Sequence, residues 1–71
     1  MDVDMVYKNR NIVFALIDNR FTQRELARRS GVHETRLSLM VNGRLIPSES
    51  EAERIAKALG RTPLELFKEI A

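Results

Sequence analysis

The chain has 71 residues, no cysteine and one histidine, which excludes a disulfide, a thiolate metal site and a cluster of histidine ligands. This is the length of one small domain, and no stretch approaches the ~18 consecutive apolar residues of a membrane span. The formal net charge is only +2, so any preference for a polyanion must come from how the charges are distributed.

The first helix is predicted over about residues 7–18, after a short arm, residues 1–6, that we expect to be a frayed end. It contains the uninterrupted apolar run IVFALI, residues 12–17. A 3.6-residue period places Ile12, Ala15 and Leu16 on one face of the helix. The other three apolar residues of the run lie outside this face: Val13, Phe14 and Ile17. We expect the last helix to cover Phe14 and Ile17. The alternative is that they form a surface for a partner.

Residues 22–42 are predicted to form two short helices joined by a tight turn. Thr22 and Glu25 have the spacing of a capping box, which starts a helix at the next residue. Gly31 ends that helix, because glycine readily takes the left-handed conformation found after a helix end. The second helix has an apolar face made by Leu37 and Met40 and an end at Asn42-Gly43. Two helices of this length around a glycine indicate a helix-turn-helix.

Two more helices are predicted after the turn at Pro47. Ser48 and Glu51 form a second capping box at the start of a helix over residues 48–59, whose apolar face comprises Ala52, Ile55, Ala56 and Leu59, with Gly60 as its end. The last helix begins after Thr62, which forms a third box with Glu65, and it has Pro63 in its first position. Leu64 and Phe67, three apart, are expected to face the core. The chain is therefore predicted to be one all-α domain, residues 1–71, of five helices.

The positive charge is concentrated on the predicted helix-turn-helix. Residues 20–44 contain six arginines and two glutamates, a net charge of +4, whereas residues 1–19 and residues 45–71 carry −1 each. Such a distribution is expected of a protein that binds a polyanion. The alternative is a solvated charged surface.

At several fixed positions the chain resembles the lambda-repressor-like, Cro/cI-type (XRE) family of DNA-binding domains. The resemblance covers about residues 8–68 and rests on the tail IAKALGRTPLELF together with the spacing of Gln23, Ala27, Gly31, Val32, Leu37, Met40 and Asn42-Gly43. It implies a compact five-helix fold whose second motif helix enters the major groove of double-stranded DNA. It also implies a transcriptional regulator, a repressor acting as a homodimer, in the cytoplasm of a prokaryote or encoded by a phage and associated with the nucleoid. No cofactor is expected.

The resemblance also suggests a role for individual residues. The residues expected to read bases lie on the first turn of the second motif helix and on the face opposite Leu37 and Met40: His33, Glu34, Thr35, Ser38 and Leu39. Those expected to contact phosphates are Gln23, Arg24, Arg36, Asn42, Gly43 and Arg44. The dimer contacts are expected at Pro63, Leu66 and Ile70. Arg28 and Arg29 end a helix, where cations are favoured by the helix dipole, so we assign them a structural role.

Two departures from the family pattern involve three positions. Many members carry an arginine in the first helix and a glutamate before the Asn-Gly pair, and here these positions hold Leu16 and Val41. Exchanging both charges for apolar residues can be neutral or stabilising, so we expect Leu16 and Val41 to be buried between the two helices. Leu39 stands where a polar residue is usual, and it can contact a thymine methyl group.

The sequence is also compatible with a second class of function. The apolar residues Val13, Phe14, Ile17 and Leu39 would suit a protein-interaction module, such as an antitoxin or an adaptor, built on the same fold. An enzyme is not expected, because the sequence offers no Ser/His/Asp or Cys/His set and no phosphate-binding loop.

Overall fold

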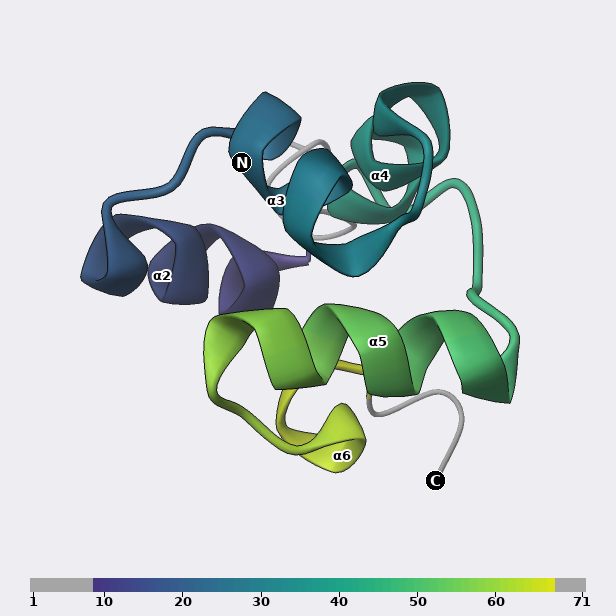
Figure 1. Cartoon of the computed structure of the whole chain (residues 1–71). Helices are drawn as coiled ribbons and strands as arrows, with labels where there is room; N and C mark the ends of the chain where they lie inside the picture. Colours follow the sequence, from purple (N-terminus) through teal and green to yellow (C-terminus); the bar gives the residue numbers. More distant parts are fainter. Residues whose placement is uncertain (1–8, 68–71) are drawn as a thin grey trace, which may run out of the picture.

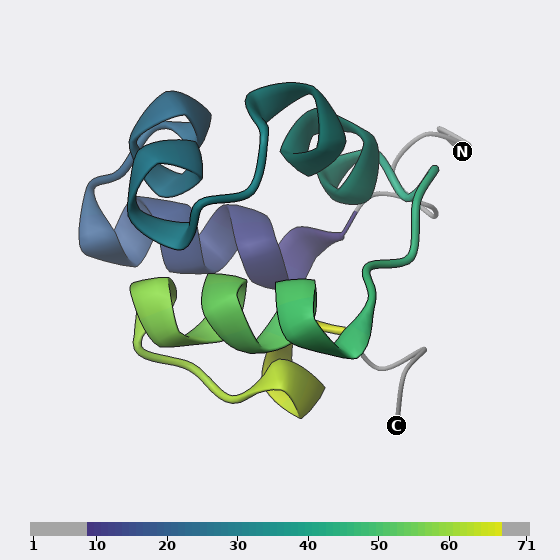
Figure 2. The same ribbon diagram turned by 45° about the vertical axis from the view of Figure 1, so that its right-hand side comes forward.

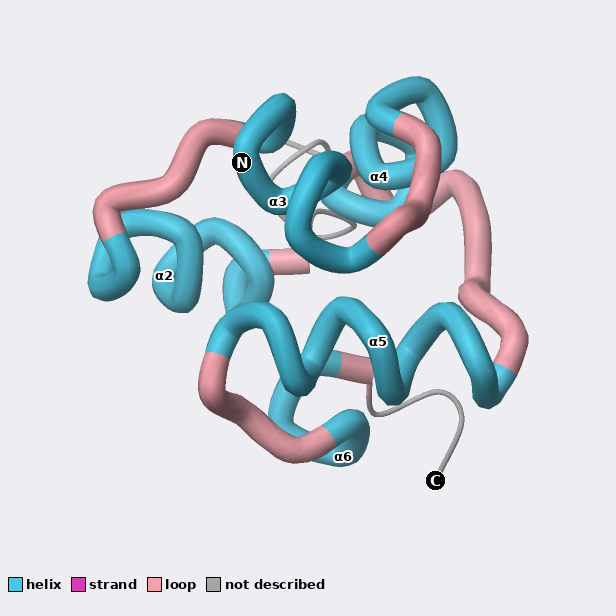
Figure 3. Tube along the Cα trace, in the orientation of Figure 1, coloured by secondary structure: helices cyan, strands magenta, loops and turns pink. Residues whose placement is uncertain are grey.

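Five helices make up the part of the chain that the computed structural model describes, residues 9–67 (Figure 1). They are α2 (Arg10–Asn19), α3 (Gln23–Ser30), α4 (Glu34–Val41), α5 (Glu49–Leu59) and α6 (Pro63–Leu66). Loops join them, and these residues contain no strand (Figure 3). The structure therefore confirms the predicted all-α fold.

The two helices of the predicted helix-turn-helix, α3 and α4, lie on the side of the molecule opposite α6 (Figures 1 and 2). Helix α3 packs against both α4 and α5, while α2 packs against α4, α5 and α6. The helix-turn-helix thus packs on α2 and α5 with its inner side, and the other helices do not cover its outer side.

Polar side chains mark the start of each helix. Thr22, Ser48 and Thr62 each accept a hydrogen bond from the backbone N–H three residues later, as predicted. Only Ser48 and Glu51 complete a capping box, in which the carboxylate also accepts from the Ser48 N–H at 3.0 Å. The Glu25 carboxylate instead binds two arginines of its own helix.

One core connects the helices. The predicted faces of α2 and α5 are buried in it, and so are Leu37 and Met40 of α4. Leu16 and Val41 are both buried in the same cluster, as expected from their apolar character. The remaining members of this core are Leu26, Val32, Leu66 and Phe67.

Two asparagines that the sequence analysis did not single out hold α2 in place. Asn9 caps the helix through its Oδ1 atom, its backbone N–H donates to the Val41 carbonyl at 2.8 Å, and its Nδ2 donates to the Leu66 carbonyl at 2.7 Å. At the other end, Asn19 Nδ2 donates to the Leu59 carbonyl at 3.0 Å. Asparagine is a favoured N-cap residue, so the role of Asn9 in starting α2 had a signal in the sequence.

The helix boundaries differ from the prediction at both ends of the described region. Helix α2 begins at Arg10 rather than near residue 7, because Asn9 has the extended backbone of an N-cap. Helix α6 has only four residues, and Phe67 after it is extended, with φ −131° and ψ 87°. The i, i+3 pattern that we applied to Leu64 and Phe67 therefore does not hold.

This early end of α6 corrects two expectations. Leu64, predicted to face the core, is 56% exposed, whereas Leu66, predicted as a dimer contact, is only 1% exposed and packs in the core with Phe67. Leu66 is therefore not available to a second copy. Pro63 is half-buried, and Ile70 lies outside the described residues.

The expectation that the last helix covers Phe14 and Ile17 is also wrong. Their side chains are 58% and 66% exposed. Helix α6 contacts α2 but has only four residues, and the apolar side chains of its Leu66 and of Phe67 after it are buried in the core. Val13 is partly buried against the core, so the exposed apolar strip on α2 is narrower than the sequence suggested.

Candidate nucleic-acid interface

The turn between α3 and α4 positions the predicted recognition surface. Helix α3 is capped at its end by Gly31, whose φ of +73° is in the left-handed region that glycine adopts at little cost. The Ser30 hydroxyl, buried beneath the turn, accepts from the Val32 N–H at 3.2 Å. His33 then starts α4, its Nδ1 accepting from the Thr35 N–H at 3.1 Å. These local bonds fix the angle at which α4 leaves α3.

An open hollow of about 400 Å³ lies on this surface. The residues that line it are Gln23, His33, Glu34, Thr35, Ser38 and Leu39. All five residues predicted to read bases are therefore brought together, and Gln23 from the start of α3 joins them. The lining offers a carboxylate, hydroxyl groups, an amide and one apolar side chain, which is a mixed set of donors and acceptors suited to the edges of bases.

His33 has a structural task in addition to its place in the hollow. Because its Nδ1 caps α4, only the Nε2 edge of the ring can meet a ligand. Asn42 is similarly engaged at the other end of α4, where its Nδ2 donates to the Ser38 carbonyl at 2.8 Å. Asn42, Gly43 and Arg44 are nevertheless exposed around the end of this helix, where contacts to a backbone were predicted.

The arginines of residues 20–44 fall into two groups. Three have carboxylate partners: Arg28 and Arg29 bind Glu25, and Arg36 binds Glu51. The hydrogen bonds from Arg28 and then Arg29 hold the pKa of Glu25 below its ordinary value. Arg29 also lies over the Phe21 ring, 4.5 Å from its centroid. The structural role assigned to Arg28 and Arg29 agrees with these contacts.

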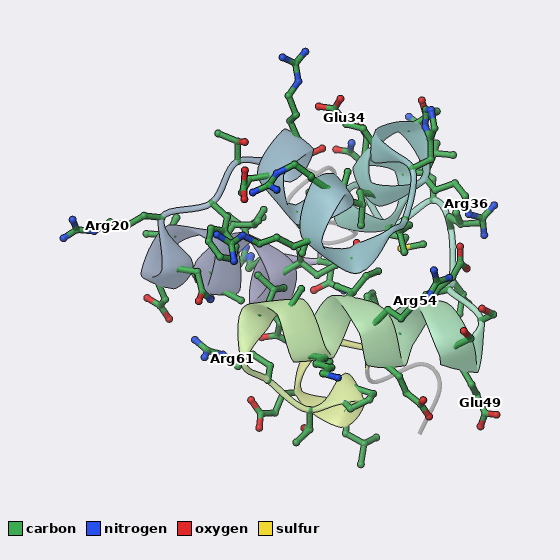
Figure 4. All side chains as sticks on the ribbon, in the orientation of Figure 1. Arg20, Glu34, Arg36, Glu49, Arg54 and Arg61 are labelled. Atoms are coloured by element: carbon green, nitrogen blue, oxygen red, sulfur yellow. The ribbon has the colours of Figure 1, made fainter. Side chains whose placement is uncertain are left out.

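The other three arginines, Arg20, Arg24 and Arg44, are exposed and have no carboxylate partner within residues 9–67. Arg20 lies at the far end of α2, well away from Glu34 at the hollow (Figure 4). Arg24 is on α3 beside Gln23, and Arg44 follows α4. Of these six arginines, Arg24 and Arg44 are therefore the two that lack such a partner and adjoin residues of the hollow, Gln23 and Leu39.

Arg36, predicted to contact a phosphate, has a carboxylate partner in the structure. Its Nε and Nη2 donate to the two carboxylate oxygens of Glu51 at 2.7 and 2.9 Å. This bidentate pair joins α4 to the first turn of α5. The sequence could not indicate it, because the partners are 15 residues apart on different helices.

Other kinds of site find little support in the described residues. No group of three or more His, Asp or Glu side chains among residues 9–67 is placed to hold a metal ion. None of the helices described is both long and apolar enough to cross a membrane.

A comparison with protein families gives one result. The model of a helix-turn-helix family matches residues 15–67, which is most of the chain and includes α3 and α4 entirely. No curated protein and no solved structure matches the chain significantly.

Proposed function

The chain belongs to the Cro/cI-type (XRE) helix-turn-helix family of DNA-binding regulators, and from this premise we propose that it is a sequence-specific repressor that binds double-stranded DNA as a homodimer. Helix α4 would lie in the major groove of each half of a pseudo-palindromic operator. The protein would act in the cytoplasm of a prokaryote, or be phage-encoded.

The observation that carries this proposal is the hollow on α3 and α4. Its polar lining faces outward, and two exposed cations adjoin lining residues: Arg24 follows Gln23 in sequence, and the Arg44 N–H donates to the Leu39 carbonyl. Cations beside a surface of mixed donors and acceptors are the arrangement by which phosphate contacts position a protein while side chains read base edges. Glu34 would serve selectivity rather than affinity, because a carboxylate accepts from cytosine but is repelled by phosphates.

Titration with duplex DNA at several salt concentrations tests both the proposal and the role of Arg44. We expect Arg44→Ala to weaken binding to all sequences similarly and to reduce the slope of log K against log salt by about 0.9, the value for one phosphate contact. Arg28→Ala is the matched control, since Arg28 is already paired with Glu25. A parent protein that does not bind duplex even at low salt would refute DNA binding.

Glu34 has a different expected signature. Glu34→Ala should change which base is preferred at one operator position, by about 1–3 kcal/mol, while leaving or slightly improving binding to random duplex. Selection from a randomised duplex library, performed with the parent and the variant, measures this directly. If Glu34→Ala has the same effect on every sequence, Glu34 does not read a base.

The homodimer needs a revised contact surface. With Leu66 in the core, the exposed apolar residue nearest the predicted interface is Leu64, next to the half-buried Pro63. We expect Leu64→Glu to leave half-site binding unchanged and to abolish cooperative binding of two copies to a full operator, measured as stoichiometry and Hill coefficient. If the Leu64→Glu variant still binds cooperatively, the dimer contact lies on another surface. Ile17→Glu then tests the exposed side of α2 as that surface.

A protein-interaction module remains the second candidate, and the exposure of Phe14 and Ile17 favours it. Both functions can use different surfaces of the same fold, because none of the residues that line the hollow belongs to α2. The arrangement of these helices is shown in Figure 1. The duplex titration separates them: an interaction module without DNA binding would show no affinity that depends steeply on salt.

A further inference from the structure

Arg36 is the only lysine or arginine on α4, and it points away from the hollow. Arg36 and Glu34 leave the helix on different sides (Figure 4), as expected for residues two apart, which are about 200° apart around a helix. The guanidinium reaches across to α5 and forms two short hydrogen bonds with Glu51, at 2.7 and 2.9 Å.

Glu51 is a fixed acceptor. Its carboxylate completes the capping box of α5 by accepting from the Ser48 N–H at 3.0 Å, so its position is set by the start of the helix. The side chain is only 12% exposed, although that of Arg36 is 47% exposed. The hydrogen bond from Arg36, then that from the Ser48 backbone, lowers the pKa of Glu51 to about 2, so the carboxylate is charged at neutral pH.

We propose that Glu51 is a positioning residue for DNA binding, which holds Arg36 away from the phosphate backbone so that α4 enters the groove without a free cation. This inference rests on the DNA-binding function proposed above. A guanidinium neutralised by a bidentate carboxylate displaces no counterion from DNA, so it adds nothing to sequence-independent affinity. With Arg36 paired to Glu51, the contacts of α4 with DNA would be made by the side chains that line the hollow.

Three variants test this inference: Glu51→Gln, Arg36→Gln and the double variant. Glutamine keeps the capping box, because its carbonyl oxygen can still accept from the Ser48 N–H, but it removes the charge that holds Arg36. Arg36→Gln keeps a long polar side chain of good helix propensity on α4. Thermal unfolding of each variant checks that the fold is retained.

The readout is the salt dependence of binding to a random-sequence duplex. We expect Glu51→Gln to steepen the slope by about 0.9 and to tighten binding about eightfold at ~0.1 M salt, the effect of one additional phosphate contact. Arg36→Gln should leave the slope unchanged, and the double variant should match the parent. Glu65→Gln is the control for net charge, because it removes one negative charge from α6, on the side of the molecule opposite α4 (Figure 1).

Two results would overturn the inference. If Arg36→Gln flattens the slope by about 0.9, Arg36 leaves Glu51 on binding and contacts a phosphate. The inference also fails if Glu51→Gln does not steepen the salt dependence, or steepens it no more than Glu65→Gln does. Glu51 would then not keep Arg36 away from the phosphates. In both cases the parent still binds duplex, whereas a parent that fails to bind at low salt refutes the proposed function itself.

Discussion

A Val41→Glu variant is expected to lose about 3–5 kcal/mol of unfolding free energy, because its carboxylate would be buried without a partner. Val41 is buried at the end of α4 in the cluster that also contains Leu16. A domain of this length has a total stability of about 4–10 kcal/mol, so this loss is a large fraction of the total. Urea denaturation measures the loss.

Adding Leu16→Arg to this variant should recover part of the loss, since the two charges would then form the ion pair common in the family. The recovery should be incomplete because of the distance between the two positions. The Asn9 N–H binds the Val41 carbonyl, and Leu16 lies nearly two helical turns after Asn9, so an arginine at position 16 must extend back along α2 to reach position 41. Leu39→Glu, at a partly exposed position of the same helix, is the control and should cost far less. A Val41→Glu protein as stable as the parent would contradict the burial of this position.

The second large effect is expected on α6. Leu66→Ala should cost about 2–5 kcal/mol, because it removes a side chain that is 1% exposed and leaves a cavity beside Phe67. Leu64→Ala, two residues earlier on the same short helix, should change stability by no more than about 0.5 kcal/mol. The pair is well matched, since the substitution is identical and only burial differs.

Chemical denaturation of both variants in parallel measures the difference. Equal losses for Leu64→Ala and Leu66→Ala would mean that α6 packs differently from the arrangement described. A large loss at Leu64 alone would restore the original prediction that Leu64 faces the core.

Local sequence signals predicted most of the fold because they act over three or four residues. Thr22, Ser48 and Thr62 start helices, and Gly31 and Gly60 end them, through bonds to neighbouring backbone groups. The apolar face of α5 follows in the same way from helix periodicity. The prediction failed at α6, where the helix stops after four residues and periodicity no longer decides which leucine is buried.

The candidate site was predicted in part for a similar reason. Residues on the outer face of α4 share one hollow, as a helical pattern requires, and Gln23 joins them across the turn at Gly31. The sequence did not reveal which arginines lack a carboxylate partner. Arg36 pairs with Glu51 on another helix, and Arg28 pairs with Glu25, which was expected to complete a capping box instead. Charge counted along the sequence therefore overestimated the number of arginines in residues 20–44 that lack a carboxylate partner.

The hydrogen bonds of Asn9 have a consequence for how the protein unfolds. This residue joins the start of α2 to the carbonyls of Val41 and Leu66, the latter 57 residues away in sequence. Neither α2 nor α6 can detach without breaking a bond that holds the other, so we expect the two ends of the described chain to open together. For so small a domain, this linkage favours a single cooperative transition over gradual fraying from either end.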